Sequence, residues 1–356
     1  MRVRFIGGMI EKGYSGGRLL ALGMAEALAI AGAKVDFITN CVPEMYKEFE
    51  PFSRVRIKTA DFRNMSPWVD RMIDVVIIIP GGAAGYHSEW VRHAIECRAK
   101  IILLNFESPN WFNKVSPFKR RMDLWAGWDI VSEHADLILS ISAEGNKYAR
   151  AYYSNCPQGC LFDFCYPGIN TILADKAPEA SRREKRIVLL SRADPHKGYD
   201  ALDALPHRDL AGFSVVVYLG TGHFPKWKAW LWKKKFEKAG MKIEVQNAIT
   251  GVDKFTMLKN SACLFFPTRF EGFGLPPLEA AYCLMPCACS DLPVLKEFGQ
   301  GAFSYGDPDN PGDMRRAILE SLKSQERVIK EHDRISRIAR IDEWGKRVAK
   351  TLERIA

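Results

Sequence analysis

The sequence predicts an α/β protein of two domains, each built on a parallel sheet. The chain opens with a strand, a glycine-rich loop, a helix and a second strand, the order of a βαβ unit. Several later segments are continuous apolar runs, typical of parallel strands buried on both faces. The 356 residues correspond to two domains at about 150 residues each, and the strand pattern starts again after a polar stretch at 177–185.

The first half of the chain carries the elements of one such domain. Residues 3–6 form the opening strand, and residues 18–31 repeat apolar residues at helical spacing until Gly32, a natural helix C-cap. Residues 34–39 form the next strand. Further apolar runs predict buried strands at 74–80, 100–105 and 135–142. We assign residues 1–166 to this N-terminal domain.

The second half repeats the pattern after the charge-rich stretch at 177–185, which has the composition of an interdomain linker. The spacing predicts a helix over 197–205 and charged amphipathic helix from 314 to 355. Short strands are predicted at 186–191, 213–219, 242–245, 263–266 and 287–290. We assign residues 167–335 to the second domain and residues 336–356 to a C-terminal helix, which we expect to cross back to the first.

The composition excludes several classes of protein. Apolar residues make up 47% and charged residues 26%, which excludes a mainly disordered or fibrous chain. No run approaches the roughly 18 apolar residues of a membrane helix, and Glu11 ends the first apolar stretch too early for a signal peptide. Nine cysteines without a regular framework predict a reducing cytoplasm. The cluster of Cys156, Cys160 and Cys165 matches no zinc spacing, so no metal is expected.

The net charge of +9 favours an anionic partner, but no nucleic-acid module is visible and nucleic acid is not expected. Two segments, 111–128 and 224–242, mix cationic with aromatic residues. If the second is helical, Trp227 and Trp230 share a face, and such a mixture suits a membrane interface. The alternative is a solvated basic helix whose tryptophans pack on their own domain. We expect peripheral attachment to an anionic surface on the cytoplasmic side of a membrane.

Five glycines in residues 7–17 form the loop between the first strand and the first helix. The loop is no P-loop, because Tyr14 occupies the place of the required lysine, and no G-x-G-x-x-G pattern fits it. Gly16 and Gly17 directly precede the helix, whose free amides can hold a phosphate. A flexible strand-to-helix turn explains the two glycines equally well.

A second candidate site lies in residues 268–280, TRFEGFGLPPLEA, directly after an apolar strand. Its two prolines suit the first turn of a helix, since proline lacks the N–H left unpaired there. The amides of Gly274 and Leu275 therefore lie just before the helix start. Glu271 and Glu279 flank this anion-friendly turn, and the helix dipole alone does not explain Glu271.

A third candidate segment, residues 191–198 (SRADPHKG), follows another strand. Arg192 and Lys197 lie at the carboxyl end of that strand, where ligands of parallel sheets bind. Two such cations suit a diphosphate, the arginine as a fork and the lysine as a point charge. Taken alone, this segment is equally well a solvated basic loop.

Together the three segments resemble glycosyltransferase family 4, the retaining nucleotide-sugar transferases of the GT-B fold, in which two Rossmann-like domains face each other across a cleft. EGFGLPPLE resembles the E-x7-E signature of that family. The flanking segments that are also similar are YPGIN at 166–170, SRADPHKG at 191–198, VVVYLGTG at 215–222 and SDLPVLKEF at 290–298. The similarity is strongest over residues 166–303, and the N-terminal half matches by pattern.

The resemblance implies a role for each matching residue. Arg192 and Lys197 would hold the donor diphosphate, Glu271 would bind hydroxyls of the donor sugar, and Glu279 would bind the nucleotide ribose. Arg192, Lys197 and Glu271 then form the catalytic set. The remaining donor-binding residues are Gly16, Gly17, Ile249, Gly272, Phe273, Gly274 and Leu275. The family requires no metal ion, and its nucleotide sugar is a co-substrate. The resemblance therefore implies no cofactor.

The acceptor side departs from the family pattern. Many members carry a histidine after the fourth N-terminal strand, where this chain has Glu107. A carboxylate can accept a hydrogen bond from a hydroxyl, but it does not replace an imidazole. Tyr86 and His87 complete the acceptor-side candidates, although an isolated histidine is more often structural. The signature helix usually ends at a glycine, and here Leu284 takes that place.

The implied function is metal-independent transfer of a sugar, with retention, from a nucleotide diphosphate sugar to a hydroxyl of a carbohydrate or lipid-linked acceptor in cell-surface glycan synthesis. The alternative is a non-catalytic nucleotide-sugar binding or scaffold protein. The intact set of Arg192, Lys197, Glu271 and Glu279 favours an enzyme. The missing dinucleotide fingerprint disfavours an oxidoreductase. The sequence leaves the base, the sugar, the acceptor and the oligomeric state open.

Overall fold

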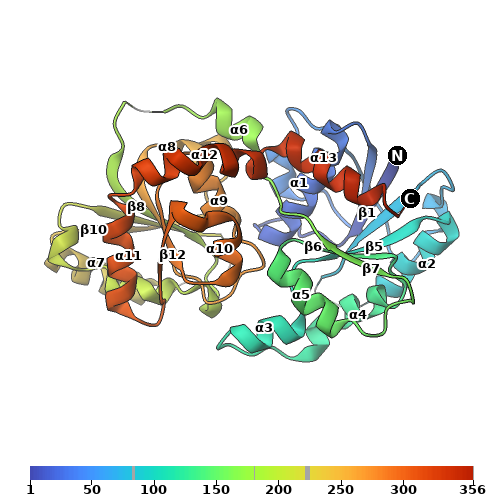
Figure 1. Cartoon of the computed structure of the whole chain (residues 1–356), viewed down its shortest axis with the longest axis horizontal. Helices are drawn as coiled ribbons and strands as arrows, with labels where there is room; N and C mark the ends of the chain where they lie inside the picture. Colours follow the sequence, from blue (N-terminus) through green and yellow to red (C-terminus); the bar gives the residue numbers. More distant parts are fainter. Residues whose placement is uncertain (82–84, 180, 221–224, 356) are drawn as a thin grey trace. The chain divides into compact units, whose positions relative to one another are not determined.

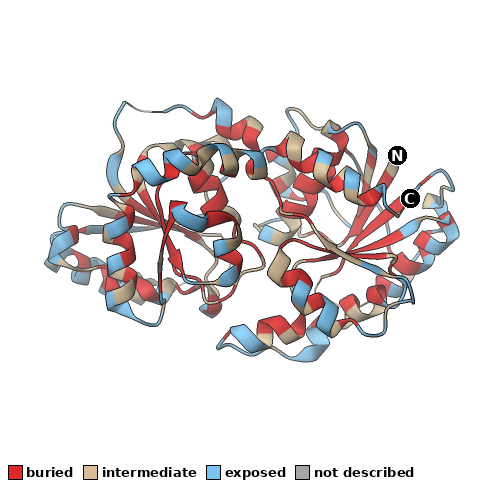
Figure 2. Cartoon of the chain, viewed as in Figure 1, coloured by how far each residue is buried: buried red, intermediate tan, exposed pale blue. Residues whose placement is uncertain are grey.

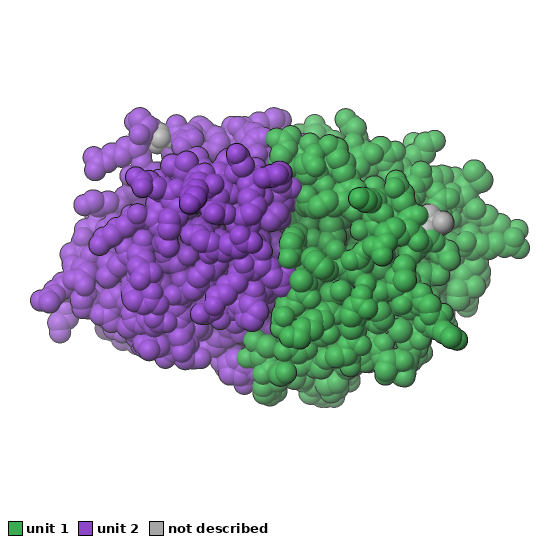
Figure 3. All heavy atoms as spheres, in the orientation of Figure 1, with its two compact units in different colours: residues 1–115, 119–168, 340–356 green, residues 116–118, 169–339 purple. Residues whose placement is uncertain are grey.

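The chain forms two compact units, which Figure 3 colours separately. The computed structural model describes residues 1–81, 85–179, 181–220 and 225–355. Unit 1 comprises residues 1–115, 119–168 and 340–356, and unit 2 comprises residues 116–118 and 169–339. The long boundaries thus fall at 168/169 and 339/340, where the sequence-based division has 166/167 and 335/336.

Unit 1 is built on a seven-stranded parallel sheet with the order β3-β2-β1-β4-β5-β6-β7 (Figure 1). Its strands are β1 (Arg2–Gly7), β2 (Lys34–Thr39), β3 (Arg56–Thr59), β4 (Val75–Ile79), β5 (Lys100–Asn105), β6 (Leu137–Ser140) and β7 (Leu161–Phe164). Its helices are α1 (Gly16–Ile30), α2 (His87–Cys97), α3 (Pro109–Val115), α4 (Ala126–Ser132), α5 (Ala143–Tyr152) and α13 (Ile341–Leu352), with 3₁₀ turns η1 (Glu44–Glu48), η2 (Ser66–Trp68) and η3 (Met122–Trp125). The middle of this sheet is buried (Figure 2). Its central strand β4 is buried along its whole length, which explains its uninterrupted apolar run.

The last helix, α13, packs on α1 inside unit 1. Small residues allow this close approach on both helices. A side chain at Gly345 would lie 1.9 Å from the carbonyl oxygen of Ala27, and one at Gly23 would lie 3.1 Å from the ring of Trp344. Trp344 is only 1% exposed, so the C-terminal end of the chain contributes to the core of unit 1.

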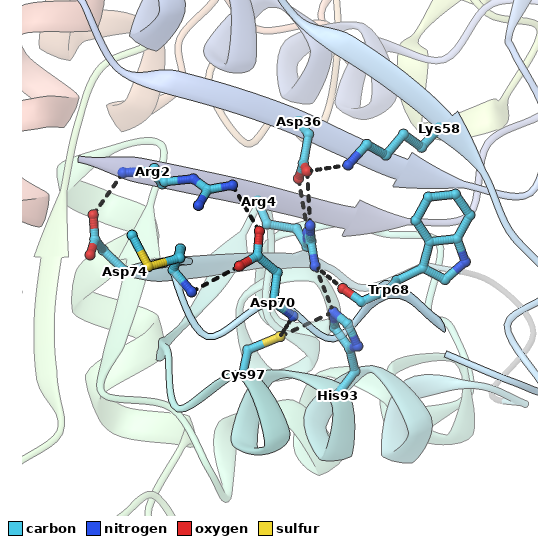
Figure 4. A network of polar contacts seen from close by, with 10 residues as sticks. Arg2, Arg4, Asp36, Lys58, Trp68, Asp70, Asp74, His93 and Cys97 are labelled. Atoms are coloured by element: carbon cyan, nitrogen blue, oxygen red, sulfur yellow. Dashed lines mark hydrogen bonds and ion pairs between the residues drawn. The ribbon is translucent and has the colours of Figure 1, made fainter. Parts of the chain in front are cut away.

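A buried polar cluster joins β1, β2 and α2 (Figure 4). Arg4, only 2% exposed, donates two hydrogen bonds of 2.8 Å to Asp36, its register partner on β2. It also donates to the carbonyl of Trp68 at 2.5 Å, and it lies 3.1 Å from His93 Nε2. Burial raises the pKa of Asp36, but the hydrogen bonds from Arg4 and Lys58 outweigh it and hold that pKa below its usual value.

Unit 2 is built on a six-stranded parallel sheet with the order β10-β9-β8-β11-β12-β13 (Figure 1). Its strands are β8 (Glu184–Ser191), β9 (Ser214–Leu219), β10 (Lys242–Asn247), β11 (Ser261–Phe266), β12 (Cys287–Ser290) and β13 (Phe303–Gly306). Its helices are α6 (Thr171–Lys176), α7 (Lys226–Lys238), α8 (Gly251–Lys259), α9 (Leu275–Tyr282), α10 (Pro293–Gly299), α11 (Pro311–Ser321) and α12 (Gln325–Ala339). Its 3₁₀ turns are η4 (Pro195–Lys197), η5 (Tyr199–Ala204), η6 (Arg208–Leu210) and η7 (Gln300–Ala302). None of the helices in the described ranges combines the length and the apolar composition needed to span a bilayer.

The α/β class and the two parallel sheets confirm the fold predicted from the sequence, with differences in detail. The helix predicted over 197–205 is instead a pair of 3₁₀ turns interrupted at Gly198. The stretch predicted as helical from 314 to 355 consists of the three helices α11, α12 and α13. Strands β3, β7 and β13 were not predicted. Each has four residues and lies at a sheet edge, so its pattern is short, and β3 and β7 bury few of their residues. Residues 221–222 of the glycine-containing segment at 215–222, and residue 224 of the second basic segment, lie outside the described residues.

The polar cluster predicts a pH-dependent stability. Burial, and secondarily Arg4, lowers the pKa of His93 to about 4, whereas an unfolded histidine has a pKa of 6.5. Between these values the unfolded chain binds a proton that the folded chain does not, so acidification from pH 6.5 to 4 favours unfolding. A shift of this size corresponds to about 3 kcal/mol. His93→Gln, which keeps an acceptor for Arg4, should remove this component from urea-denaturation free energies measured across that range.

His134→Gln is the matched control, because His134 is exposed. It should leave the pH profile of the wild type unchanged. Parallel profiles for the wild type and the His93 variant would contradict the assignment. They would leave the Asp36 carboxylate, which faces the same cluster, as the source of any acid sensitivity.

Candidate functional site

The candidate site in unit 2 forms where the neighbouring strands β8 and β11 end. The two strands are parallel and adjacent, so the loops at their carboxyl ends meet although 74 positions separate them. Lys197 comes from the loop after β8 and Glu271 from the loop after β11. Lys197 Nζ lies 2.5 Å from Glu271 Oε1, and the two side chains are 16% and 14% exposed. The structure thus brings two of the predicted site residues into a direct, largely buried ion pair.

Gly198 allows this approach. Its φ is +66°, a left-handed conformation, and a Cβ at this position would lie 1.8 Å from the carbonyl oxygen of Pro267. The two loops also bond through their backbones. The amide of Arg269 donates to the carbonyl of His196 at 2.8 Å, and Thr268 Oγ1 bonds the same carbonyl at 3.3 Å. The lysine and the glycine that follows it are therefore fixed against the second loop.

Arg269 anchors the loop that carries Glu271. Its guanidinium forms a bidentate pair with Asp200 at 2.8 and 2.9 Å and contacts Asp309 at 2.7 Å. Its side chain is only 9% exposed. The hydrogen bonds that Arg269 donates to the Asp200 carboxylate are the main reason why the pKa of Arg269 lies above its usual value. A bidentate pair constrains orientation as well as distance, so this arginine fixes the loop between β11 and α9.

Glu279 lies in α9 and has a partner that the sequence analysis missed. Lys254 of α8 places its Nζ 2.6 Å from Glu279 Oε1, and both side chains are 7% exposed. The buried stripe of α8 gives the signal that finds this lysine, because Lys254 shares it with Met257 and Leu258 at helical spacing. A lysine among buried apolar residues requires a partner.

The turn before α9 has the geometry expected from the sequence. Gly274 is the N-cap residue with a φ of +105°, and the two prolines occupy the first turn of the helix. A side chain at Gly274 would lie 2.6 Å from Leu295, so the turn is closed on that side. Phe273 is 2% exposed and stacks on Phe298 with the ring centroids 4.5 Å apart. Its side chain anchors the turn, which leaves its backbone as the part that can meet a ligand.

The remaining donor-side residues are more open. Arg192 pairs with Asp194 at 2.8 Å, and their side chains are 38% and 35% exposed. Gly272 and Ile249 are partly buried, Gly272 in the loop after β11 and Ile249 just before α8. Arg192 therefore holds an exposed cation near the end of β8, and its carboxylate partner is close in sequence.

Gly16 and Gly17 belong to unit 1, where they are the first two residues of α1. Ser15 is the N-cap residue, and its side chain makes no capping hydrogen bond. A side chain at Gly16 would meet open space, whereas one at Gly17 would lie 3.5 Å from the ring of Phe106. The start of α1 therefore has room beside Gly16 for a ligand to approach its amides.

The three acceptor-side candidates, also in unit 1, have different surroundings. Glu107 follows β5 and pairs with Arg120 at 3.1 Å, with 24% of its side chain exposed. Tyr86 is 39% exposed. His87 is 1% exposed, and its ring lies 4.7 Å from Trp90 and would lie 2.4 Å from a side chain at Gly127. This burial favours the structural alternative for His87 and leaves Glu107 and Tyr86 as the accessible groups.

Two further observations concern metal-ligating and nucleophilic side chains. Across the residues that the structure describes, no group of three or more histidine, cysteine or acidic side chains is arranged to hold a metal ion. Burial, and secondarily the nearby Glu279 carboxylate, raises the pKa of Cys283 to about 12. This thiol therefore stays protonated at neutral pH and is a poor nucleophile.

The buried pair of Lys254 and Glu279 predicts a large stability effect. Lys254→Met leaves the carboxylate buried without its cation, which should lower the free energy of unfolding by about 3–5 kcal/mol. Lys346→Met removes the matched exposed pair with Glu343 and should cost less than about 1 kcal/mol. The double change Lys254→Met with Glu279→Leu should recover most of the loss. Urea denaturation measures all three, and equal stability of the two single variants would contradict the prediction.

Comparisons with known proteins agree with this architecture. Residues 173–342 match the family Glycosyl transferases group 1. The serotype-specific mannosyltransferase WbdA of Escherichia coli is 23% identical over 320 residues, covering 80% of this chain and 36% of that protein. The O-antigen chain mannosyltransferase B of Escherichia coli is 40% identical over 58 residues, covering 16% of this chain and 15% of that protein. The chain spans about a third or less of the length of these curated relatives.

Solved structures share the fold across both units. HepE from Anabaena, in complex with UDP-glucose, superposes with a TM-score of 0.73 at 13% identity, covering 99% of this chain and 100% of that one. Sucrose-phosphate synthase from Thermosynechococcus elongatus gives a TM-score of 0.72 at 15% identity, covering 99% and 98% of the two chains. These likenesses show a GT-B fold of two Rossmann-like units. With the family match and the mannosyltransferase relatives, they support a glycosyltransferase of the GT-B type.

Proposed function

We propose that the chain is a retaining, metal-independent glycosyltransferase that moves a sugar from a nucleotide diphosphate sugar to a hydroxyl of a glycan or lipid-linked acceptor. The observation that carries this proposal is the pair of Lys197 and Glu271, 2.5 Å apart at the adjacent ends of β8 and β11. A cation for phosphate and a carboxylate for sugar hydroxyls thus occupy one point of the sheet edge. This edge is where parallel sheets bind their ligands.

The donor would replace the internal ion pair by stronger complementary contacts. Its diphosphate takes the charge of Lys197 and of Arg192, whose guanidinium is 38% exposed. The sugar hydroxyls donate to Glu271, which has then lost its lysine partner. Glu279 accepts hydrogen bonds from the ribose, and the ion pair with Lys254 orients this carboxylate. In this proposal, both residues of each ion pair have a role in donor binding.

Catalysis in this proposal rests on stabilising the leaving group. The bond from the anomeric carbon to the phosphate oxygen breaks, and negative charge builds on the diphosphate, where Lys197 and Arg192 offset it. The acceptor oxygen attacks the same face of the sugar, and its proton passes to the departing phosphate oxygen. The configuration is retained, and no covalent sugar–enzyme intermediate is required. Holding the acceptor beside the anomeric carbon supplies the remaining acceleration.

A mannosyl donor and a cell-surface glycan are the first candidates for the substrates. Both curated relatives are named mannosyltransferases, one of them for the O-antigen chain, and HepE has been solved with UDP-glucose. A thermal-shift screen should therefore include GDP, UDP and ADP with their mannose and glucose derivatives. The matching nucleotide should raise the melting temperature, since ligand binding to the native state stabilises it by RT ln(1 + [L]/Kd).

The variants that test catalysis are Arg192→Ala and Lys197→Ala. Each should lower the rate of sugar transfer by about 10²-fold or more, because a lost transition-state donor costs that much. Lys323→Ala, at an exposed lysine of the same unit, is the control and should retain full activity. Near-normal transfer by the double variant would overturn the assignment. Nucleotide binding without measurable transfer by the wild type would favour the non-catalytic binding protein.

The roles of the two carboxylates can be separated by titration calorimetry. Glu271→Gln should impair transfer while leaving the affinity for the free nucleoside diphosphate largely unchanged, because that residue is assigned to the sugar. Glu279→Gln should instead weaken binding of the nucleotide. The reverse order would mean that the two roles are exchanged. Transfer should also continue in EDTA, and a strict need for a divalent ion would contradict the metal-independent mechanism.

A further inference from the structure

Helix α7 of unit 2 presents apolar residues on two opposite faces. Exposed and buried residues alternate along it (Figure 2). Trp232 and Phe236 point into the core of unit 2, at 2% and 0% exposure, and Trp232 Nε1 bonds Asp203 at 3.2 Å. Trp227 and Trp230 are 64% and 59% exposed on the other face. The packing alternative therefore holds for Trp232, whereas Trp227 and Trp230 do not pack on the core of the unit.

The outer face combines these indoles with an aliphatic residue and with lysines. Leu231, 47% exposed, lies four positions after Trp227, and Lys234 and Lys238 continue the same face at spacings of three and four. The whole helix contains six lysines and one glutamate. Lys235 bonds Asp203 at 2.9–3.2 Å and Lys228 lies over the rings of Tyr199 and Trp232, so these two lysines face the unit.

The other basic aromatic segment behaves differently. Within residues 111–128, the three tryptophans at 111, 125 and 128 are 2%, 1% and 8% exposed. Their indoles therefore belong to the core of unit 1, as the packing alternative requires. Exposed tryptophans surrounded by lysines are a property of α7 that residues 111–128 do not share, and two large exposed indoles on one helix face need an explanation.

We propose that the outer face of α7 binds an anionic lipid bilayer. The indoles and Leu231 would enter the boundary between headgroups and acyl chains, and the lysines would contact the lipid phosphates. A second copy of the chain is disfavoured, because apposed α7 helices would bring their lysines together. Nucleic acid is disfavoured because Leu231, beside the two indoles, gains nothing from stacked bases. None of the residues on this outer face belongs to the donor-site residues, so binding can be tested without transfer activity.

Vesicle sedimentation tests the proposal with the full chain. Vesicles of phosphatidylcholine with 30% phosphatidylglycerol should bind the protein at low salt and release it at high salt, because salt shortens the Debye length. Vesicles of phosphatidylcholine alone should bind it much more weakly. Tryptophan emission should shift to the blue on binding, and Trp227→Phe with Trp230→Phe should abolish the shift while binding persists.

Two variants separate charge from insertion. Changing Lys233, Lys234 and Lys238 to Gln should weaken binding about 100-fold, at about five-fold for each lysine. Trp227→Ser with Trp230→Ser should weaken it at least about ten-fold through the lost apolar contact. The matched controls change exposed residues elsewhere, namely Lys176, Lys323 and Lys330 to Gln in one variant and Met72 and Ile329 to Ser in the other. Both controls should bind as the wild type does.

Several outcomes would overturn the proposal. The first is that the protein does not bind anionic vesicles at low salt. The second is that it binds neutral vesicles as strongly as anionic ones. The third is that the control variants lose as much vesicle binding as the α7 variants do. A fourth is that analytical ultracentrifugation shows a dimer of the wild type that the Trp227→Ser, Trp230→Ser variant does not form. That result would assign the face to a second copy of the chain. Displacement of bound vesicles by an oligonucleotide with higher affinity would assign it to nucleic acid. The melting temperatures and the nucleotide binding of the variants should equal those of the wild type. If they do, a failure of the membrane proposal does not contradict the proposed transferase function.

Discussion

The parallel pairing of β8 with β11 is the constraint on which the candidate site of unit 2 depends. It places the loop after β8 beside the loop after β11, and the left-handed Gly198 lets the two backbones touch. Arg269 then ties the second loop to Asp200 and Asp309. Lys197 and Glu271 meet because these contacts leave their loops little freedom, and not because either residue is close to the other in sequence.

Both carboxylates of the site are paired with lysines, yet the two pairs differ in their surroundings. Glu279 and Lys254 are 7% exposed, whereas Lys197 and Glu271 are 16% and 14% exposed. A buried pair is expensive to break, because the remaining charge loses its solvation without compensation. The more exposed pair is easier to open, which fits the proposal that the donor exchanges it for phosphate and hydroxyl contacts. Lys254 would then stay in place as the constant partner of Glu279.

Much of this arrangement follows from the sequence, because apolar runs and loop chemistry are local properties. The apolar runs predict the central strands, and the two prolines predict a helix start within one residue of Leu275, where α9 begins. Leu284 shows what local reasoning misses. It lacks the glycine expected at that helix end, yet it adopts the left-handed φ of 57° that a glycine would take. Its carbonyl accepts a hydrogen bond from Gln325, a residue of another helix. Lys254 was missed because its partner Glu279 lies 25 positions away in another helix, and the edge strands were missed because their patterns are short.

The faces of α7 show how one packing contact decides what the sequence leaves open. Tryptophans and lysines occur all around this helix, so its pattern does not tell which side faces the sheet. Once Trp232 bonds Asp203 and enters the core, the rotation of the helix is fixed. At about 100° for each residue, Trp230 lies about 160° away from Trp232, and Trp227 lies about 140° away. The burial of one indole therefore forces the other two outward, into the position from which they can meet a membrane.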